Sequence, residues 1–124
     1  MYISTDAIIL KNTPYKESSI ISRIFTYDHG KTSVIFKGAK NSKHNISGMV
    51  EPGNIISITY YNSSGLKTVK DVNLKKIHYN TRKLLDNYYY IMAIISLLDK
   101  LCQENHAEKD LFDLFLNILD DINN

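Results

Sequence analysis

The sequence predicts a five-stranded β-barrel followed by an α-helical hairpin. Between residues 2 and 77, short runs rich in Ile, Val, Thr, Tyr and Phe alternate with clusters of Gly, Pro, Asn and Ser, a pattern typical of strands and turns. After residue 80 the apolar residues instead recur every three or four positions, as in amphipathic helices. The net charge changes sign at nearly the same place. Residues 1–85 carry 13 Lys/Arg and 5 Asp/Glu, net +8, and residues 86–124 carry 2 and 8, net −6, which together give +2.

Five strands are expected, at residues 3–12, 19–27, 31–37, 54–62 and 66–77. The turns between the second and third strands and between the fourth and fifth each end in a glycine, Gly30 and Gly65. Glycine reaches the positive φ that tight hairpins require, so both connections are predicted to be antiparallel hairpins. The 16 residues from Gly38 to Gly53 are expected to form turns between the third and fourth strands.

Alternation in two of the strands predicts which side chains face the core. Apolar residues occupy every second position, so one face of the strand is buried and the other is exposed to solvent. The side chains expected to point inward are Thr32, Val34, Phe36, Ile56, Ile58 and Tyr60. The strand at 19–27 has a mixed pattern, and its faces are left unassigned.

Two helices are expected after the strands. The apolar stripe of the first consists of Leu84, Tyr88, Ile91, Ile95, Leu98 and Cys102, with Asn80 or Thr81 as its N-cap. The second begins near Glu108, and its apolar face consists of Leu111, Phe112, Phe115, Ile118, Leu119 and Ile122. The link "QENHA" is short enough for an antiparallel helical hairpin. The stripe is wider than five small strands can cover and the helical pattern is still running at the last residues. These features indicate further helical segments after residue 124 or an oligomer, and we favour the further segments.

Composition argues against several classes of protein. A single cysteine excludes an internal disulfide framework, and no stretch approaches about 18 uninterrupted apolar residues. The N-terminus lacks the features of a signal peptide, so we expect a cytoplasmic protein without a membrane anchor. The four histidines are not paired at ligand spacing, and the chain has no phosphate-binding loop or nucleophile elbow. We therefore expect no metal, no cofactor and no catalytic residues in this chain.

Short antiparallel strands with a long third connection suit the OB-fold, although composition permits an SH3-like barrel almost as well. The decision comes from a resemblance to a known family. The segments that carry it are "TDAIIL" (5–10), "YKES" (15–18), "FTYDHGK" (25–31), "FKGAK" (36–40), "EPGN" (51–54) and "LFDLFLNIL" (111–119). In this order and spacing they resemble the N-terminal part of the RecO family of DNA repair and recombination mediators. The resemblance implies an OB-fold domain at 1–79 and, at 80–124, a helical hairpin that starts a larger C-terminal helical domain.

The resemblance also implies a function. RecO proteins are non-enzymatic: they bind single- and double-stranded DNA, anneal complementary strands in the bacterial cytoplasm at the nucleoid, and act with single-strand binding protein and the mediator RecR. Many have a four-cysteine zinc cluster in the later helical domain, which cannot be carried over to a chain with one cysteine. The surface for the tail of single-strand binding protein lies mostly in helices beyond this chain. A further departure is at Lys16 and Ser19, where the family usually has glycine and aspartate.

A basic loop, "FKGAKNSKHN", is the expected DNA contact. Lysines on a glycine-containing loop suit a phosphate-tracking groove, because counterion release requires no fixed geometry. If the second and third strands pair, Arg23 and Lys31 are expected beside it, and exposed tyrosines are candidates for base stacking. The predicted DNA-binding residues are Lys37, Lys40, Lys43, Lys31, Arg23 and Tyr61.

Each feature also has a structural interpretation. A lysine cluster can be a solvated connection, and a strand tyrosine is more often half-buried packing. The second basic run, on the fifth strand, is interpreted as a solvated face, with a widening of the DNA-binding patch as the alternative; its members are Lys67, Lys70, Lys75 and Lys76. The alternative function is a protein-interaction adaptor that works through its helical hairpin.

Overall fold

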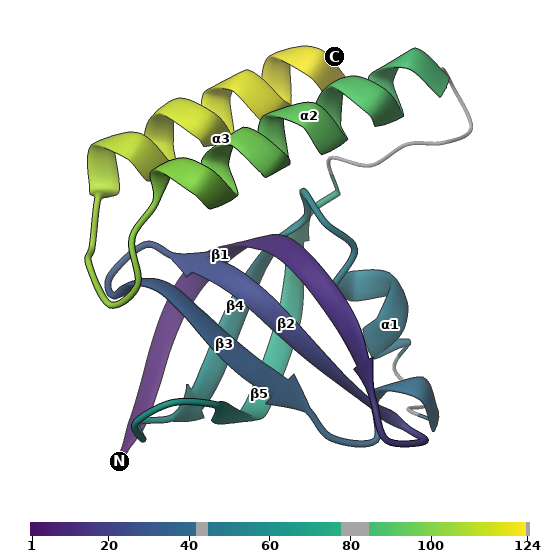
Figure 1. Cartoon of the computed structure of the whole chain (residues 1–124), viewed down its shortest axis with the longest axis vertical. Coiled ribbons are helices and arrows are strands. Elements are labelled where there is room, and N and C mark those ends of the chain that lie inside the picture. The colour runs from purple at the N-terminus through teal and green to yellow at the C-terminus, as the bar shows by residue number, and fades with distance from the viewer. Residues whose placement is uncertain (42–44, 78–84, 124) are drawn as a thin grey trace.

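The computed structural model describes residues 1–41, 45–77 and 85–123, and it contains a barrel with two helices packed on it (Figure 1). The strands are β1 (Tyr2–Tyr15), β2 (Ser19–Thr26), β3 (Gly30–Phe36), β4 (Ile55–Tyr61) and β5 (Lys67–Lys76). A 3-10 turn, η1 (Ala39–Asn41), and a one-turn helix, α1 (Ile46–Met49), lie between β3 and β4. The long helices are α2 (Leu85–Leu101) and α3 (Lys109–Asn123).

The five strands close into a barrel in the order β1-β2-β3-β5-β4. Both predicted hairpins, β2–β3 and β4–β5, are confirmed. Four neighbouring pairs are antiparallel, but β3 and β5 are parallel over two residue pairs, Val34 with Lys67 and Ile35 with Thr68. A closed ring with an odd number of strands must contain at least one parallel pair, and in this barrel that pair is the β3–β5 seam. The strand order and the long β3–β4 connection confirm the OB-fold.

The barrel interior contains the side chains that alternation predicts. All six predicted inward residues are buried, and the core around Ile56 and Ile58 includes Ile9, Ile24 and Phe36. The mixed pattern of β2 has a physical cause. Ile24 faces the barrel interior, whereas its neighbour Phe25 faces the helices, so both sides of this strand are apolar.

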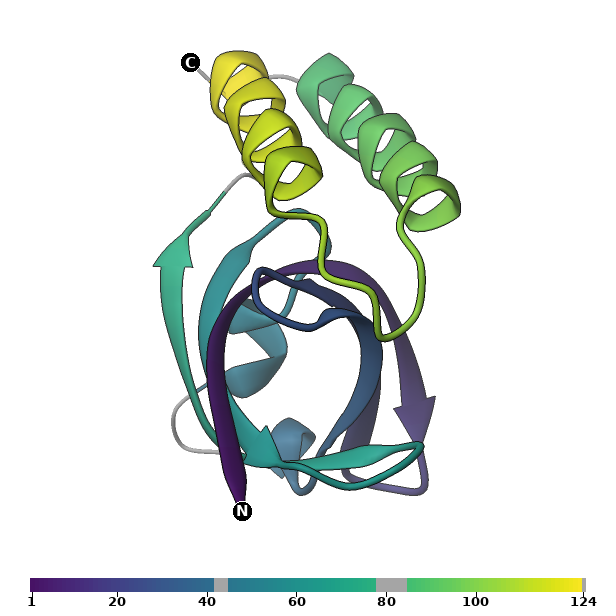
Figure 2. The ribbon, with the colours of Figure 1, turned by 90° about the vertical axis from the view of Figure 1, so that its left-hand side faces the viewer.

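Helices α2 and α3 lie side by side over one outer face of the barrel, which the two views show in agreement (Figures 1 and 2). A second apolar core joins them to the barrel through Ile8, Leu10 and Phe25. The predicted helical hairpin is therefore confirmed. From the predicted stripes, the buried members are Ile91, Ile95, Leu98, Cys102, Phe112, Phe115 and Leu119. The predicted caps and Leu84 lie outside the described residues. Among the described residues, neither helix is long and apolar enough to cross a membrane.

The connection between β3 and β4 is more structured than the sequence predicts. Ala39 of η1 is buried, and Ile46 and Met49 of α1 pack against the barrel core. A single helical turn is too short to show a 3.6-residue period, which explains why pattern analysis interprets this segment only as turns.

Candidate nucleic-acid interface

The start of the basic loop is held against the β1–β2 turn. The backbone N–H of Lys40 donates to the carbonyl of Ser18 at 2.9 Å, and that of Gly38 donates to Ser19 Oγ at 3.4 Å. The side chains of Lys37 and Lys40 remain exposed. Lys43, the third predicted loop lysine, lies outside the described residues. The loop thus presents its cations from an anchored backbone.

The β1–β2 turn adds a further exposed cation, Lys16, beside this loop. Lys16 has φ +54°, a left-handed conformation that glycine and asparagine adopt more readily than other residues. Lysine at this position places a positive charge in the turn, directly before the acidic Glu17.

Ion pairing separates the basic residues into two groups. Among the described residues, the cations of Lys16, Lys37, Lys40 and Lys70 have no carboxylate within 4.0 Å. By contrast, Lys75 pairs with Asp6 at 2.7 Å, and Lys76 pairs with Asp120 at 3.0 Å. A phosphate contact is most favourable for a cation that gives up no existing partner. The uncommitted lysines are therefore the better candidates for DNA contacts.

Arg23 and Lys31 lie beside each other, but both contact Asp99 of α2. The guanidinium donates two hydrogen bonds to this carboxylate, from Nε to Oδ1 at 2.9 Å and from Nη2 to Oδ2 at 2.5 Å. Lys31 Nζ donates to the Asp99 carbonyl at 2.7 Å and approaches Oδ1 at 3.4 Å. Burial raises the pKa of Asp99, but the hydrogen bond and charge of Arg23, together with the charge of Lys31, lower it by more than burial raises it. The net shift of the pKa is therefore downward.

The structure does not bring this pair to the basic loop. Lys31 is at the start of β3 and Lys37 follows its end, six residues apart, which corresponds to about 20 Å along a strand. Arg23 and Lys31 join the barrel to α2. A role for them in DNA binding stays a prediction, and it would require them to share or leave Asp99.

Tyr61 belongs to an exposed aromatic pair. It lies opposite Tyr2 across β1 and β4, with ring centroids 4.5 Å apart and hydroxyl oxygens 2.8 Å apart. Both side chains are 44% exposed, and Lys70 Nζ lies 4.3 Å from the centroid of the Tyr2 ring. The hydrogen bond that the Tyr2 hydroxyl donates to Tyr61 is the main cause of a raised Tyr2 pKa. This arrangement combines aromatic faces with a cation, as in platforms for unpaired bases.

A partly apolar slot lies beside Lys70, the lysine that contacts the Tyr2 ring, and the acidic Asp71 is also among its lining residues. Its volume is about 220 Å³, and Lys37 from the end of β3 and Lys70 from β5 both line it. Phe36, Met49 and Val69 contribute apolar surface. Sequence reasoning placed Lys70 in a second basic run but did not predict its contact with Tyr2, because the β4–β5 pairing and the approach of Tyr2 decide where its side chain lies. We call Lys40, Lys37, this slot, Lys70 and the Tyr2–Tyr61 pair the basic-aromatic surface.

The fifth strand does not form the uniformly solvated face that the sequence predicts. Lys75 and Lys76 are exposed, but Lys67 is buried, with a relative exposure of 8%. Its Nζ donates to the carbonyl of Gly65 at 3.1 Å. Lys67 lies on the seam where β5 meets β3, so tertiary pairing rather than local pattern buries it. Within the described part of the chain, no three His, Cys, Asp or Glu residues are grouped closely enough to hold a metal ion.

Comparison with known proteins agrees with this arrangement of a barrel and two helices. A family model described as "Recombination protein O N terminal" matches residues 1–78, and one described as "Recombination protein O C terminal" matches residues 82–124. The DNA repair protein RecO of Pelodictyon phaeoclathratiforme is 28% identical over 98% of this chain and 48% of its own length. RecO of Bacillus pumilus is 30% identical over 99% and 48%, respectively. The chain spans about half the length of the curated relatives it matches. Since the N-terminal model alone matches more than half of the chain, the chain belongs to the RecO family of recombination proteins.

Proposed function

We propose that this chain is a non-enzymatic DNA-binding and strand-annealing module of a RecO-type recombination mediator, acting in the bacterial cytoplasm. The observation that carries the proposal is the basic-aromatic surface, in which lysines without a described ion-pair partner flank an exposed tyrosine pair. Family membership supports DNA repair as the setting. The division into an OB-fold domain at 1–79 and the start of a helical domain at 80–124 is part of the proposal.

The chemistry of the surface suits a single strand. Lys37, Lys40 and Lys43 would neutralise phosphates and release condensed counterions, a contribution that is independent of sequence. Bases could stack on the exposed face of Tyr61, a contact worth about 1 to 3 kcal/mol per base. Neither contact requires the Watson–Crick edges, so a held strand can still pair with its complement. Phosphate neutralisation also lowers the repulsion between two strands that anneal.

Partners follow from the family rather than from contacts in this structure. Single- and double-stranded DNA, single-strand binding protein and a RecR-type mediator are the proposed partners. The family's zinc cluster is not assigned to this chain, which has one cysteine.

The salt dependence of binding to a fluorescein-labelled oligonucleotide tests the proposal. About four phosphate contacts predict a slope of log affinity against log salt of roughly −3 for a single strand. Replacing Lys37, Lys40 and Lys43 together by Ala should make this slope shallower by about 2 and weaken binding to every sequence alike.

The matched control replaces Lys75 and Lys76, which pair with Asp6 and Asp120, and a much smaller effect is expected. If the control variant loses the slope while the loop variant keeps it, DNA lies elsewhere on the barrel. If neither variant changes the slope, the loop is a solvated connection and the proposed binding mode is wrong.

One observation favours the adaptor as a second candidate. Three leucines of the helices, Leu97, Leu101 and Leu114, are 48%, 49% and 54% exposed in this chain. Leucines this exposed are compatible with a protein contact. A protein partner held by such surface should stay bound at high salt, whereas a phosphate-dependent DNA complex should dissociate.

A further inference from the structure

Lys67 is a lysine whose side chain is buried in the fold. It begins β5, directly after the β4–β5 turn, and is 92% buried, yet its only described hydrogen bond is to the carbonyl of Gly65. Among the described residues, no carboxylate lies within 4.0 Å of its Nζ. An ammonium group has three N–H donors, so two remain for another acceptor. Burying a positive charge without an anion is unfavourable, which points to an acceptor that binds beside it.

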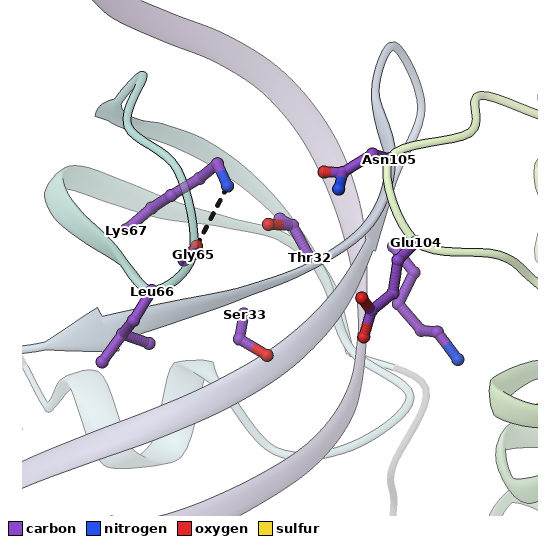
Figure 3. Close-up of a pocket in the computed structure, with 8 residues that line it drawn as sticks. Thr32, Ser33, Gly65, Leu66, Lys67, Glu104 and Asn105 are labelled. Carbon is purple, nitrogen blue, oxygen red and sulfur yellow. Dashed lines mark hydrogen bonds between the residues drawn. The ribbon is translucent and has the colours of Figure 1, made fainter.

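A polar cleft surrounds this amine (Figure 3). Its volume is about 260 Å³, and an adjoining cleft of about 240 Å³ shares Thr32, Lys67 and Asn105 as lining residues. In Figure 3, the Thr32 hydroxyl and the Asn105 side chain point toward the space in front of Lys67, with the amide oxygen of Asn105 on the side of Lys67 and its NH2 group next to it. The ammonium, hydroxyl and amide groups together can donate several hydrogen bonds to one oxyanion.

Backbone pairing holds the walls of the cleft in place. The α2–α3 link forms a β-bridge with the start of β3, in which Lys31 N–H donates to the Gln103 carbonyl and Asn105 N–H donates to the Lys31 carbonyl. This bridge pairs Glu104 with Lys31 and so holds the next residue, Asn105, at the cleft that Thr32 also lines. The β3–β5 seam fixes Lys67, which lies opposite Val34. The three donors therefore come from three different segments that are joined by hydrogen bonds.

Two further charged groups line the cleft. Lys31 contributes little free charge, because it contacts Asp99. Glu104 brings a negative charge that opposes anion binding. The preference of the cleft for an anion therefore rests on Lys67, and Glu104 should weaken it.

We propose that this cleft binds one phosphate group, with Lys67 as its charged ligand and Thr32 and Asn105 as neutral donors. The site is separate from the basic-aromatic surface. A backbone phosphate of a DNA strand and a free phosphate ion are two sources of the same group. If the source is DNA, the inference rests on the proposed function; β3 and the β4–β5 turn, which border the cleft, belong to the region where OB-folds commonly bind oligonucleotides.

Amide chemical shifts in a titration of the 124-residue chain with inorganic phosphate, at constant ionic strength against chloride, test the site. Saturable shifts are expected at Thr32, Lys67 and Asn105. They should vanish in Lys67→Met and persist in Lys75→Met, the control on the same strand. Glu104→Gln should tighten phosphate binding about two- to fivefold. Absence of these shifts in the unmodified chain, or their persistence in a folded Lys67→Met variant, overturns the inference. If Lys67→Met does not fold, the titration of the unmodified chain and of Glu104→Gln still decides.

A second arm with an oligo(dT) strand identifies the source. If the strand fills the cleft, oligo(dT) should displace phosphate, and Lys67→Met should make the salt slope of DNA binding shallower by about 0.7. If phosphate still shifts these amide signals in the presence of oligo(dT), the cleft is a site for free phosphate, whether or not DNA binds elsewhere. If DNA binding depends on Lys37 and Lys40, and neither phosphate nor oligo(dT) shifts the amide signals of the cleft residues, this inference is overturned and the proposed function still stands.

Discussion

Asp99→Asn is expected to weaken the attachment of α2 to the barrel. In the structure this carboxylate accepts two hydrogen bonds from Arg23 of β2, and Lys31 Nζ of β3 lies 3.4 Å from its Oδ1. The side chains are partly buried, with 37% exposure for Arg23, 20% for Asp99 and 15% for Lys31. The amide is nearly the same shape as the carboxylate but has no charge, so the substitution tests the electrostatic contribution with little change in packing.

The expected loss lies between two reference cases. Exposed ion pairs contribute about 0.2 to 1 kcal/mol, and removing one partner of a fully buried pair costs about 3 to 5 kcal/mol. For a partly buried carboxylate shared by two cations we expect a loss of about 2 kcal/mol in the free energy of unfolding. In a chain of this length that corresponds to a melting temperature lower by roughly 6 to 10 °C. Urea unfolding followed by circular dichroism measures the free energy directly.

The pH dependence of the same variant provides an independent check. The folded-state pKa of Asp99 is lowered from its ordinary value. Its stabilisation is therefore complete above the unfolded pKa of about 4 and disappears as the pH falls through the lower folded pKa. The stability difference between the unmodified chain and Asp99→Asn should be largest near neutral pH and shrink below pH 4.

The matched control is Asp6→Asn, which removes an exposed pair with Lys75. A loss of no more than about 1 kcal/mol is expected there. If Asp99→Asn and Asp6→Asn unfold alike at pH 7, or if the Asp99→Asn difference does not depend on pH, then Asp99 does not hold α2 to the barrel by charge.

Three further predictions concern packing and the buried thiol. Phe115→Ala should lower the free energy of unfolding by about 3 to 5 kcal/mol, and exposed Leu114→Ala by under about 1; equal losses in urea unfolding would contradict the packing of α3. Gly30→Ala should destabilise more than Gly65→Ala, because both have positive φ but only the first would place its Cβ 2.3 Å from the backbone of the helix link; similar unfolding midpoints would refute this. Burial raises the pKa of Cys102 to about 11, so this thiol should react slowly with thiol reagents at pH 8 until denaturant is added, and rapid labelling of the folded chain would show that it is accessible.

Sequence patterns predicted the five strands and the two long helices of this protein, but not which charged side chains remain available on its surface. The hairpins are set by local features, such as a glycine with positive φ at Gly30 and at Gly65. Alternation over two residues placed Ile56 and Ile58 in the barrel, and spacing of three and four placed Ile95 against it. Each of these signals depends on residues within a few positions of one another, so a single sequence can show it.

Tertiary structure alone decided which of the described lysine and arginine side chains have no ion-pair partner. Arg23 and Asp99 are 76 positions apart, and Tyr2 and Tyr61 are 59 apart, so no local pattern could reveal either contact. Lys67 belongs to a basic run that looks solvated in sequence, but the parallel seam with β3 buries it. Barrel closure and helix docking bring distant segments together, and the partners that they supply determine whether a lysine stays available for phosphate. Charge composition is a property of the chain, whereas the availability of each charge is a property of the fold.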